Sequence, residues 1–324
     1  MLIQPYDSGA LQRLSERTDY EAWFLEAVYT IGEDDLFPTF PDGVIYPSNG
    51  ASPEYIRHMR GRAVIGDWRS GFLGAGAPLV FVTAFKLLDM IMEWVLGENG
   101  ATPSFRFQEK IARLSGPISF PGVVECRPWL RERLLGLYRT LEPLRGTIIH
   151  DKHFASSDGA VHVSSSRHGI VGPQVDIEPG QLRSLSQTVV SVLRYIDGTW
   201  PIDEYREKQL RYAFDGLTQL HGCPDLSQER PFYTTVRVYS GRAGLRAIHP
   251  HKIQADLTTP YGTSDCMFDL RVILVEAGAV TDAFLLPWPV LRGSVFGTLG
   301  DVDLEAYRIA IPDDIDPKHF RQNG

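Results

Sequence analysis

One segment of this 324-residue chain combines residue types that can hold a phosphate and move protons. It reads LYRTLEPLRGTIIHDKHF over residues 137–154 and places Arg145 and His150 five positions apart. A guanidinium stays charged and can donate two parallel hydrogen bonds to a phosphate. An imidazole has an ordinary pKa of about 6.5, close to working pH, so it suits general acid or base catalysis. The pair is therefore suited to binding a phosphate and transferring a proton.

The residues before this pair predict the helix that carries it. Pro128 suits a first helical position, and apolar residues then recur at helical spacing to about residue 149. Pro143 lies inside this stripe and should bend the helix. Five residues along a regular α-helix correspond to about 140° of rotation. Arg145 and His150 are therefore not expected to share one helical face.

Apolar periodicity predicts further helices along the first two thirds of the chain. Ser52 and Pro53 resemble the start of one helix, which would continue to about residue 68. Three glycines between residues 71 and 76, followed by Pro78, predict a break before the most apolar helix. Residues 34–49 are rich in proline, glycine and aspartate and predict a loop. The other expected helices cover residues 15–31, 79–96, 105–114, 179–195 and 202–220.

The pattern becomes strand-like in two places. Asp158-Gly159 predicts a hairpin within residues 154–166. Alternating or continuous apolar runs predict strands at 233–239, 268–275 and 307–311. We therefore predict a mainly α chain, α+β overall, in which a helical bundle precedes a smaller β-rich C-terminal domain. The expected divisions are an N-terminal helical region packed on the bundle (1–75), the bundle (76–222) and the β-rich domain (230–324).

The order of these helices and the R-x(4)-H spacing together resemble the HEPN superfamily of small helical bundles. The matching parts are a long apolar helix (79–96), a short FRFQEKIARL helix (105–114), the helix bearing Arg145 and His150, and closing helices over 179–220. The resemblance covers about 150 residues. It implies an HEPN-like bundle, and the hairpin after His150 is an insertion in that pattern.

The resemblance implies a metal-independent endoribonuclease that acts as a homodimer, in which two Arg–His sets line one cleft. Arg145 would stabilise charge on the phosphate, and His150 would act as base or acid, leaving a 2′,3′-cyclic phosphate. Lys152 and His153 are candidate RNA contacts, and Thr147 and Asp151 are candidate orienting groups in the substrate-binding set. No cofactor or metal is expected. Antiviral defence or a toxin–antitoxin pair, with an antitoxin or regulatory partner, is the implied setting.

The sequence also departs from the family pattern, because Gly146 occupies a position that is usually polar, often Asn or Asp, and Pro143 is a second irregularity. A second interpretation is therefore a non-catalytic HEPN-like scaffold that binds RNA, nucleotide or protein, with recognition by the C-terminal β domain. In a purely structural role, His150 would cap its helix, and Arg145 would pair with Glu142 or Asp151.

A third interpretation is a hydrolase or transferase site around the polar residues His249, His251, Asp256 and Asp265. His249 and His251 could share one strand face and hold a metal.

The net charge and the number of cysteines limit the other functions and locations that this chain could have. The formal net charge is −8, so nucleic acid would have to bind a local basic patch. Residues 127–153 contain six basic and three acidic side chains, a local excess of +3. Three cysteines without a C-x-x-C motif fit a reducing compartment. With no signal-like N-terminus and no uncharged 20-residue span, we expect a cytoplasmic protein without membrane contact.

Overall fold

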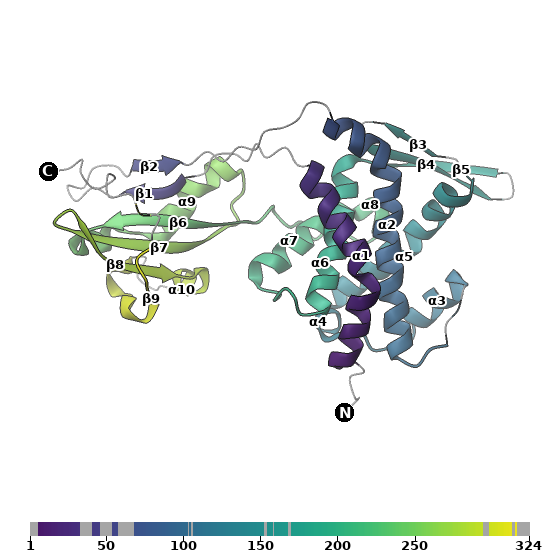
Figure 1. Cartoon of the computed structure of the whole chain (residues 1–324), viewed down its shortest axis with the longest axis horizontal. Helices are drawn as coiled ribbons and strands as arrows, with labels where there is room; N and C mark the ends of the chain where they lie inside the picture. The colour runs from purple at the N-terminus through teal and green to yellow at the C-terminus, as the bar shows by residue number, and fades with distance from the viewer. Residues whose placement is uncertain are drawn as a thin grey trace. The chain divides into compact units, whose positions relative to one another are not determined.

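A computed structural model describes residues 6–32, 41–45, 54–57, 68–102, 104, 106–151, 154–157, 159–167, 170–293, 298–312 and 315. The chain forms two compact units, each built from two stretches of sequence (Figure 1). We call residues 1–33 with 64–228 the helical unit, and residues 34–63 with 229–324 the sheet unit. The fold is α+β overall.

The helical unit is organised around one long apolar helix, α2 (Trp68–Glu98), which packs against α1, α5 and α6 (Figure 1). Phe81 and Leu88 of α2 are fully buried, as are Leu137 and Tyr138 of α5. The other helices of the unit are α1 (Ser8–Gly32), α3 (Phe107–Leu114), α4 (Gly122–Glu125), α5 (Pro128–Gly146), α6 (Pro179–Ile196), α7 (Glu204–Asp215) and α8 (Thr218–His221).

The predicted break between residues 71 and 78 is wrong, because α2 continues through the glycines and through Pro78. Proline and glycine disfavour a helix interior. Burial of the helix face outweighs that preference here, since Ala77, Val80 and Phe81 are each at most 2% exposed. α2 therefore begins about three turns before its predicted start.

A three-stranded antiparallel sheet follows α5 in the helical unit. It consists of β3 (Phe154–Ser157), β4 (Ala160–Arg167) and β5 (Ile170–Ile177), in that order. The predicted hairpin is confirmed: Ser157 pairs with Ala160, and Gly159 adopts the positive φ of 82° that the turn requires. Val161 and Val163 of β4 are fully buried, so one face of this sheet completes the helical core.

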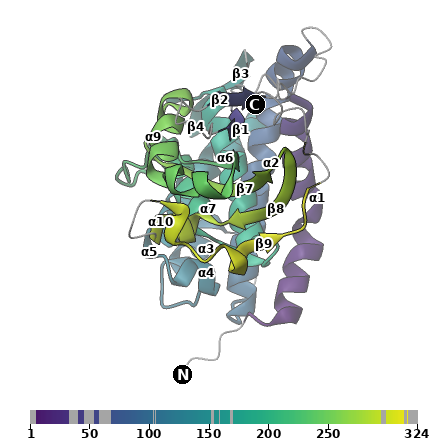
Figure 2. The ribbon, with the colours of Figure 1, turned by 90° about the vertical axis from the view of Figure 1, so that its left-hand side faces the viewer.

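The sheet unit is built on a six-stranded sheet of order β2-β1-β6-β7-β8-β9. Helices α9 (Pro250–Tyr261) and α10 (Trp288–Gly293) both pack against β7 (Figure 2). The strands are β1 (Pro41–Ile45), β2 (Glu54–Arg57), β6 (Phe232–Ser240), β7 (Cys266–Glu276), β8 (Ala279–Leu286) and β9 (Arg308–Ile309). Short 3-10 turns lie at Arg242–Ala247, Leu299–Asp301 and Leu304–Tyr307.

Two predictions for the first third of the chain are wrong. Residues 54–57 form strand β2 instead of the start of a helix, and residues 41–45 form β1 instead of a loop. Val44 pairs with Tyr55 in β2 and also with Val238 in β6, far along the chain. Residues 34–63 consequently belong to the sheet unit, and residues 1–75 are not one helical region.

Within the described residues, no helix combines the length and the apolar character that crossing a bilayer would require.

Candidate functional site

The R-x(4)-H pair lies where α5 gives way to a π-helical turn, η1 (Thr147–Asp151). Leu144 and Ile148 are buried and anchor the junction to the core, and η1 packs against β4. A π turn closes its backbone hydrogen bonds over five residues instead of four. The 140° offset predicted for a regular helix therefore does not apply between Arg145 and His150. Single π turns of this kind are frequent at functional sites.

Both side chains of the pair keep exposed surface in the described part of the structure. Arg145 is partly buried and His150 is exposed. Among the described residues, neither forms a hydrogen bond or ion pair. The alternative pairing of Arg145 with Glu142 is therefore not observed, and the His150 imidazole caps no described carbonyl. A phosphate approaching this surface would not have to displace a described protein partner.

Of the other predicted site residues, Thr147 is fully described, whereas Asp151, Lys152 and His153 lie partly or wholly outside the described residues. Thr147 is only 3% exposed, and its hydroxyl donates to the Pro143 carbonyl oxygen at 3.1 Å. This burial does not fit the predicted place of Thr147 in a substrate-binding set. Asp151 is the last residue of η1, but its side chain lies outside the described part of the structure. Lys152 and His153 also lie outside the described residues.

Three of the six basic residues in the predicted strip are held by contacts inside the helical unit, which weakens the strip as a nucleic-acid surface. Arg127 Nε donates to Glu207 Oε2 at 2.9 Å, and Arg131 donates to two backbone carbonyls while it lies over the Phe120 ring. Arg133 is 3% exposed and donates to the carbonyl oxygen of Pro224. These three arginines join elements of the helical unit, whereas Arg139 is exposed, so the local excess of +3 is only partly available to a nucleic acid.

Sequence reasoning missed a chain of hydrogen bonds on the outer face of the three-stranded sheet. Ser157 Oγ lies 3.2 Å from His162 Nε2, and His162 Nδ1 lies 2.8 Å from Asp176 Oδ1. His162 pairs directly with Asp176 across β4 and β5. The predicted hairpin already places Ser157 diagonally from His162 on one face. Asp176 could not be included because strand β5 was not predicted.

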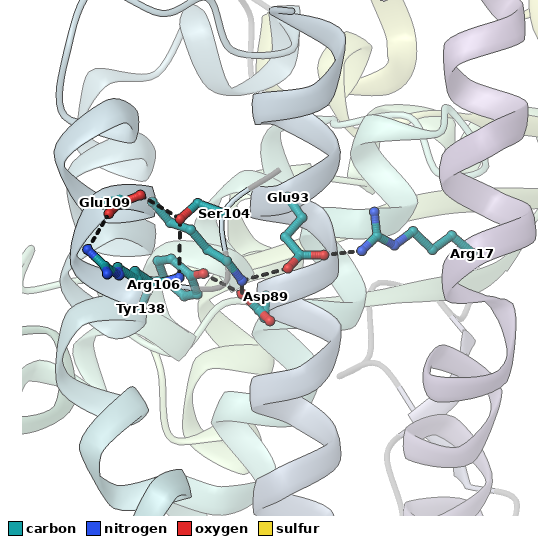
Figure 3. Close-up of polar contacts among 8 residues, drawn as sticks. Arg17, Asp89, Glu93, Ser104, Arg106, Glu109 and Tyr138 are labelled. Carbon is teal, nitrogen blue, oxygen red and sulfur yellow. Dashed lines mark hydrogen bonds and ion pairs between the residues drawn. The ribbon is translucent and has the colours of Figure 1, made fainter. Parts of the chain in front are cut away.

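A second group that the sequence did not reveal lies between α2, α3 and α5. The ammonium of Lys110 lies 3.0 Å from Asp89 Oδ1 and 2.6 Å from Glu93 Oε1. The phenol of Tyr138 donates to Asp89, and Arg17 pairs with Glu93 (Figure 3). Every charge in this polar cluster has an internal partner, so it serves to join helices and is not a candidate active site.

The predicted metal-binding arrangement of His249 and His251 is not present. His249 is the N-cap of α9 and His251 lies in its first turn, so the two residues do not share a strand face. Side chains two positions apart on a helix do not face each other. Across the ranges that the structure describes, no group of three histidine, cysteine, aspartate or glutamate side chains could hold a metal ion.

No family model, curated protein or solved structure matches this chain. The candidate site is therefore defined by the geometry of residues 145–150 and by the sequence resemblance alone.

Proposed function

We propose that this protein is a metal-independent endoribonuclease of the HEPN type, with Arg145 and His150 as its catalytic residues. The main support is that Arg145 ends α5 and His150 lies in η1 directly after it, with Arg145 partly exposed, His150 exposed and neither paired with a described residue. The sequence resemblance supplies the reaction class and the HEPN identity of the helical bundle. A role in defence or in a toxin–antitoxin pair rests on the same resemblance.

In this reaction the RNA supplies its own nucleophile. A neutral His150 accepts the proton of a 2′-hydroxyl, and the 2′-oxygen forms a bond to the adjacent phosphorus. The bond from phosphorus to the 5′-oxygen breaks, and that oxygen takes a proton from a protonated imidazole. The products are a 2′,3′-cyclic phosphate and a 5′-hydroxyl. Arg145 stabilises the charge that builds on the non-bridging phosphate oxygens through a two-pronged hydrogen bond.

The proton balance requires one basic and one acidic group, whereas the R-x(4)-H pair of one chain supplies a single imidazole. We therefore propose a two-fold homodimer in which His150 of each subunit contributes to one cleft. The exposed Ile149, at 41% exposure, lies beside the pair on η1 and would help cover such an interface. Lys152, His153 and Asp151 are adjacent in sequence and remain candidates for RNA contact.

A non-catalytic RNA- or protein-binding scaffold is the second candidate function. The arginines favour a protein-binding role for the helical unit, because Arg127, Arg131 and Arg133 are engaged in contacts within the unit and are not free to hold RNA. Gly146 also removes the polar side chain that the family pattern has next to the arginine. In this case the sheet unit would carry recognition.

Incubation of the purified full chain with total RNA in EDTA distinguishes the two functions. The nuclease proposal expects cleavage that leaves 2′,3′-cyclic phosphate ends. The rate should fall at least ~100-fold in His150→Ala, since proton transfer contributes about 10²–10⁴-fold to such reactions. His251→Ala is the matched control, because His251 is also an exposed histidine but lies in the sheet unit. RNA binding without cleavage by the wild-type protein would favour the scaffold.

Subunit mixing tests the shared cleft. Refolding the wild-type chain with an excess of His150→Ala should lower its activity by more than dilution alone, because a mixed dimer keeps one imidazole and therefore lacks either the base or the acid. Sedimentation should show a dimer. A wild-type monomer with full activity would remove the composite site from the proposal and leave single-subunit chemistry.

A further inference from the structure

Three polar side chains meet on the face of the three-stranded sheet that is turned away from the helical core. Val161 and Val163 of β4 are fully buried in that core, so His162 between them points to the opposite face. Asp176 is its direct partner on β5, and Ser157 lies diagonally from it at the end of β3. The side chains of His162 and Asp176 are 29% and 49% exposed, and Ser157 is exposed. A small molecule in solution can therefore reach this group of residues.

Asp176 carries a negative charge at neutral pH. Hydrogen bonds from the Gln174 amide and from His162 hold the pKa of Asp176 below its usual range. An ionised carboxylate can only accept hydrogen bonds. In its contact with Asp176 Oδ1, at 2.8 Å, the hydrogen must therefore lie on His162 Nδ1.

This tautomer leaves the other ring nitrogen of His162 as a base. In a neutral imidazole with the hydrogen on Nδ1, Nε2 has a free lone pair. Nε2 lies 3.2 Å from Ser157 Oγ, so the serine hydroxyl donates its hydrogen bond to this nitrogen. His162 is thus placed to remove the serine proton, and the charge of Asp176 would stabilise the imidazolium that results.

A hydroxyl, a base within hydrogen-bond reach of it and a carboxylate on the far nitrogen of that base are the parts of a catalytic triad. Triads occur on unrelated folds and in several chain orders, so they are recognised by geometry. We propose that Ser157 is the nucleophile and His162 the base of an esterase site for small, activated carboxylic esters. Because the residues lie on an exposed sheet face, the site suits small esters with a good leaving group, whereas larger ligands are usually enclosed by a pocket.

The reaction has two steps. Ser157 Oγ bonds to the carbonyl carbon of the ester while His162 Nε2 takes the serine proton. The bond from that carbon to the leaving alcohol then breaks, and the alcohol takes the proton from His162. In the second step water gives a proton to His162 and bonds to the same carbon, the bond to Ser157 Oγ breaks, and Oγ recovers the proton. The products are the alcohol and the carboxylic acid.

The test uses p-nitrophenyl acetate as the ester and the full chain as the enzyme. We expect mass spectrometry of the digested protein to find an acetyl group on Ser157. Release of p-nitrophenol should be at least ~10-fold slower in Ser157→Ala and in His162→Ala, since proton transfer contributes about 10²–10⁴-fold. The double variant should be no slower than either single variant, because the two residues act as a unit.

Ser156→Ala is the matched control. Ser156 is the preceding residue of β3, but its hydroxyl donates to the Ala160 carbonyl oxygen at 3.2 Å, so its loss should leave the rate unchanged. An unchanged rate in Ser157→Ala, or acetyl groups on other residues only, would overturn the proposal and reduce the three side chains to cross-strand contacts.

Asp176 acts through His162 and is a positioning residue, so its test needs a conservative variant. Asp176→Asn should slow the release of p-nitrophenol at least ~10-fold, because an amide does not hold the required tautomer as a carboxylate does. Asp176→Glu keeps the carboxylate and should restore part of the rate. Wild-type rates in Asp176→Asn would contradict this role.

The esterase site uses no residue of the R-x(4)-H pair, so the two proposed activities can fail separately. His150→Ala should keep the ester hydrolysis of the wild type, and Ser157→Ala should keep its RNA cleavage. Loss of ester hydrolysis in His150→Ala would show that the exposed triad is not the source of that activity.

Discussion

The ammonium of Lys110 on α3 lies 2.6 Å from Glu93 Oε1 on α2, in a contact that leaves the lysine side chain only 10% exposed (Figure 3). Burial alone would lower the pKa of Lys110, but its hydrogen bonds to Glu93 and Asp89 outweigh this effect and raise the pKa. Burial would likewise raise the pKa of Glu93, and the hydrogen bond from Lys110 with the charge of Arg17 lowers it instead. Both shifts show that the cluster stabilises the fold in its charged form.

The Lys110 contact predicts a loss of stability when the lysine charge is removed. Lys110→Met leaves Asp89 and Glu93 facing each other without their shared cation, so the free energy of unfolding should fall by about 2 kcal/mol. Urea unfolding at pH 7 measures this change. Arg106→Met is the control on the same segment, because Arg106 is 83% exposed in its pair with Glu109 and should change stability by less than about 0.5 kcal/mol.

The same cluster predicts how the stability of the fold changes with pH. Because the pKa of Glu93 is lowered by folding, its contribution is present above the ordinary value of 4.5 and is lost as the pH falls through the lowered pKa. The raised pKa of Lys110 gives a contribution that is present below 10.5 and is lost as the pH rises through the raised pKa. Urea unfolding from pH 2 to 7 should therefore show that the free energy of unfolding falls less at acid pH in Glu93→Gln than in the wild type. Parallel curves would contradict this assignment.

The buried phenol of Tyr138 predicts that removing its hydroxyl oxygen alone lowers the stability of the protein. Tyr138 is fully buried and donates a hydrogen bond to Asp89, and burial raises its pKa, so it remains a donor at all ordinary pH values. Tyr138→Phe keeps the ring against Phe85 and Phe107 but removes the donor. We expect the free energy of unfolding to fall by about 1.5–3 kcal/mol, the range for a hydrogen bond to a charged group. Tyr212→Phe, at an exposed tyrosine, should be neutral.

Two glycines predict opposite effects of the same substitution. A Cβ at Gly136 of α5 would collide with the backbone carbonyl of His221, which cannot move aside as a flexible side chain could. Gly136→Ala should therefore destabilise the helical unit by about 1–3 kcal/mol. A Cβ at Gly76 of α2 meets nothing within 4 Å, so Gly76→Ala should stabilise the unit by about 0.5–1 kcal/mol. Urea unfolding of both variants tests the close approach of α5 to α8.

Gly146 predicts a gain of activity that depends on the proposed nuclease function. A Cβ at Gly146 meets nothing within 4 Å, so the first atom of a side chain can be added here without a clash. Asn is one of the residues usual there in the family pattern, and it would restore a polar group beside Arg145. Gly146→Asn should raise the RNA cleavage rate, whereas Gly146→Ala should leave the rate unchanged while it strengthens the helix. Equal rates in all three proteins would show that this chain does not use a polar residue there.

The sequence predicted elements of both units where the signals for them are local. The apolar stripe of α5, the Asp-Gly turn before β4 and the strand patterns of β6 and β7 each reside in neighbouring residues. The R-x(4)-H pair was found in the same way, since both residues belong to one short segment. Whether the pair cleaves RNA stays a prediction.

Tertiary structure decided what depends on residues far apart in the chain. β2 is a strand because it pairs with β1, which in turn pairs with β6. This strand pairing outweighs the local helix-start signal of residues 52–54. α2 continues through Pro78 because its buried face packs into the core. The engagement of Arg127 and Arg133 and the pairing of His162 with Asp176 also depend on neighbours that no local pattern specifies. Backbone preferences of a few kcal/mol or less are set by nearby residues, whereas burial and hydrogen-bond partners are set by the whole fold.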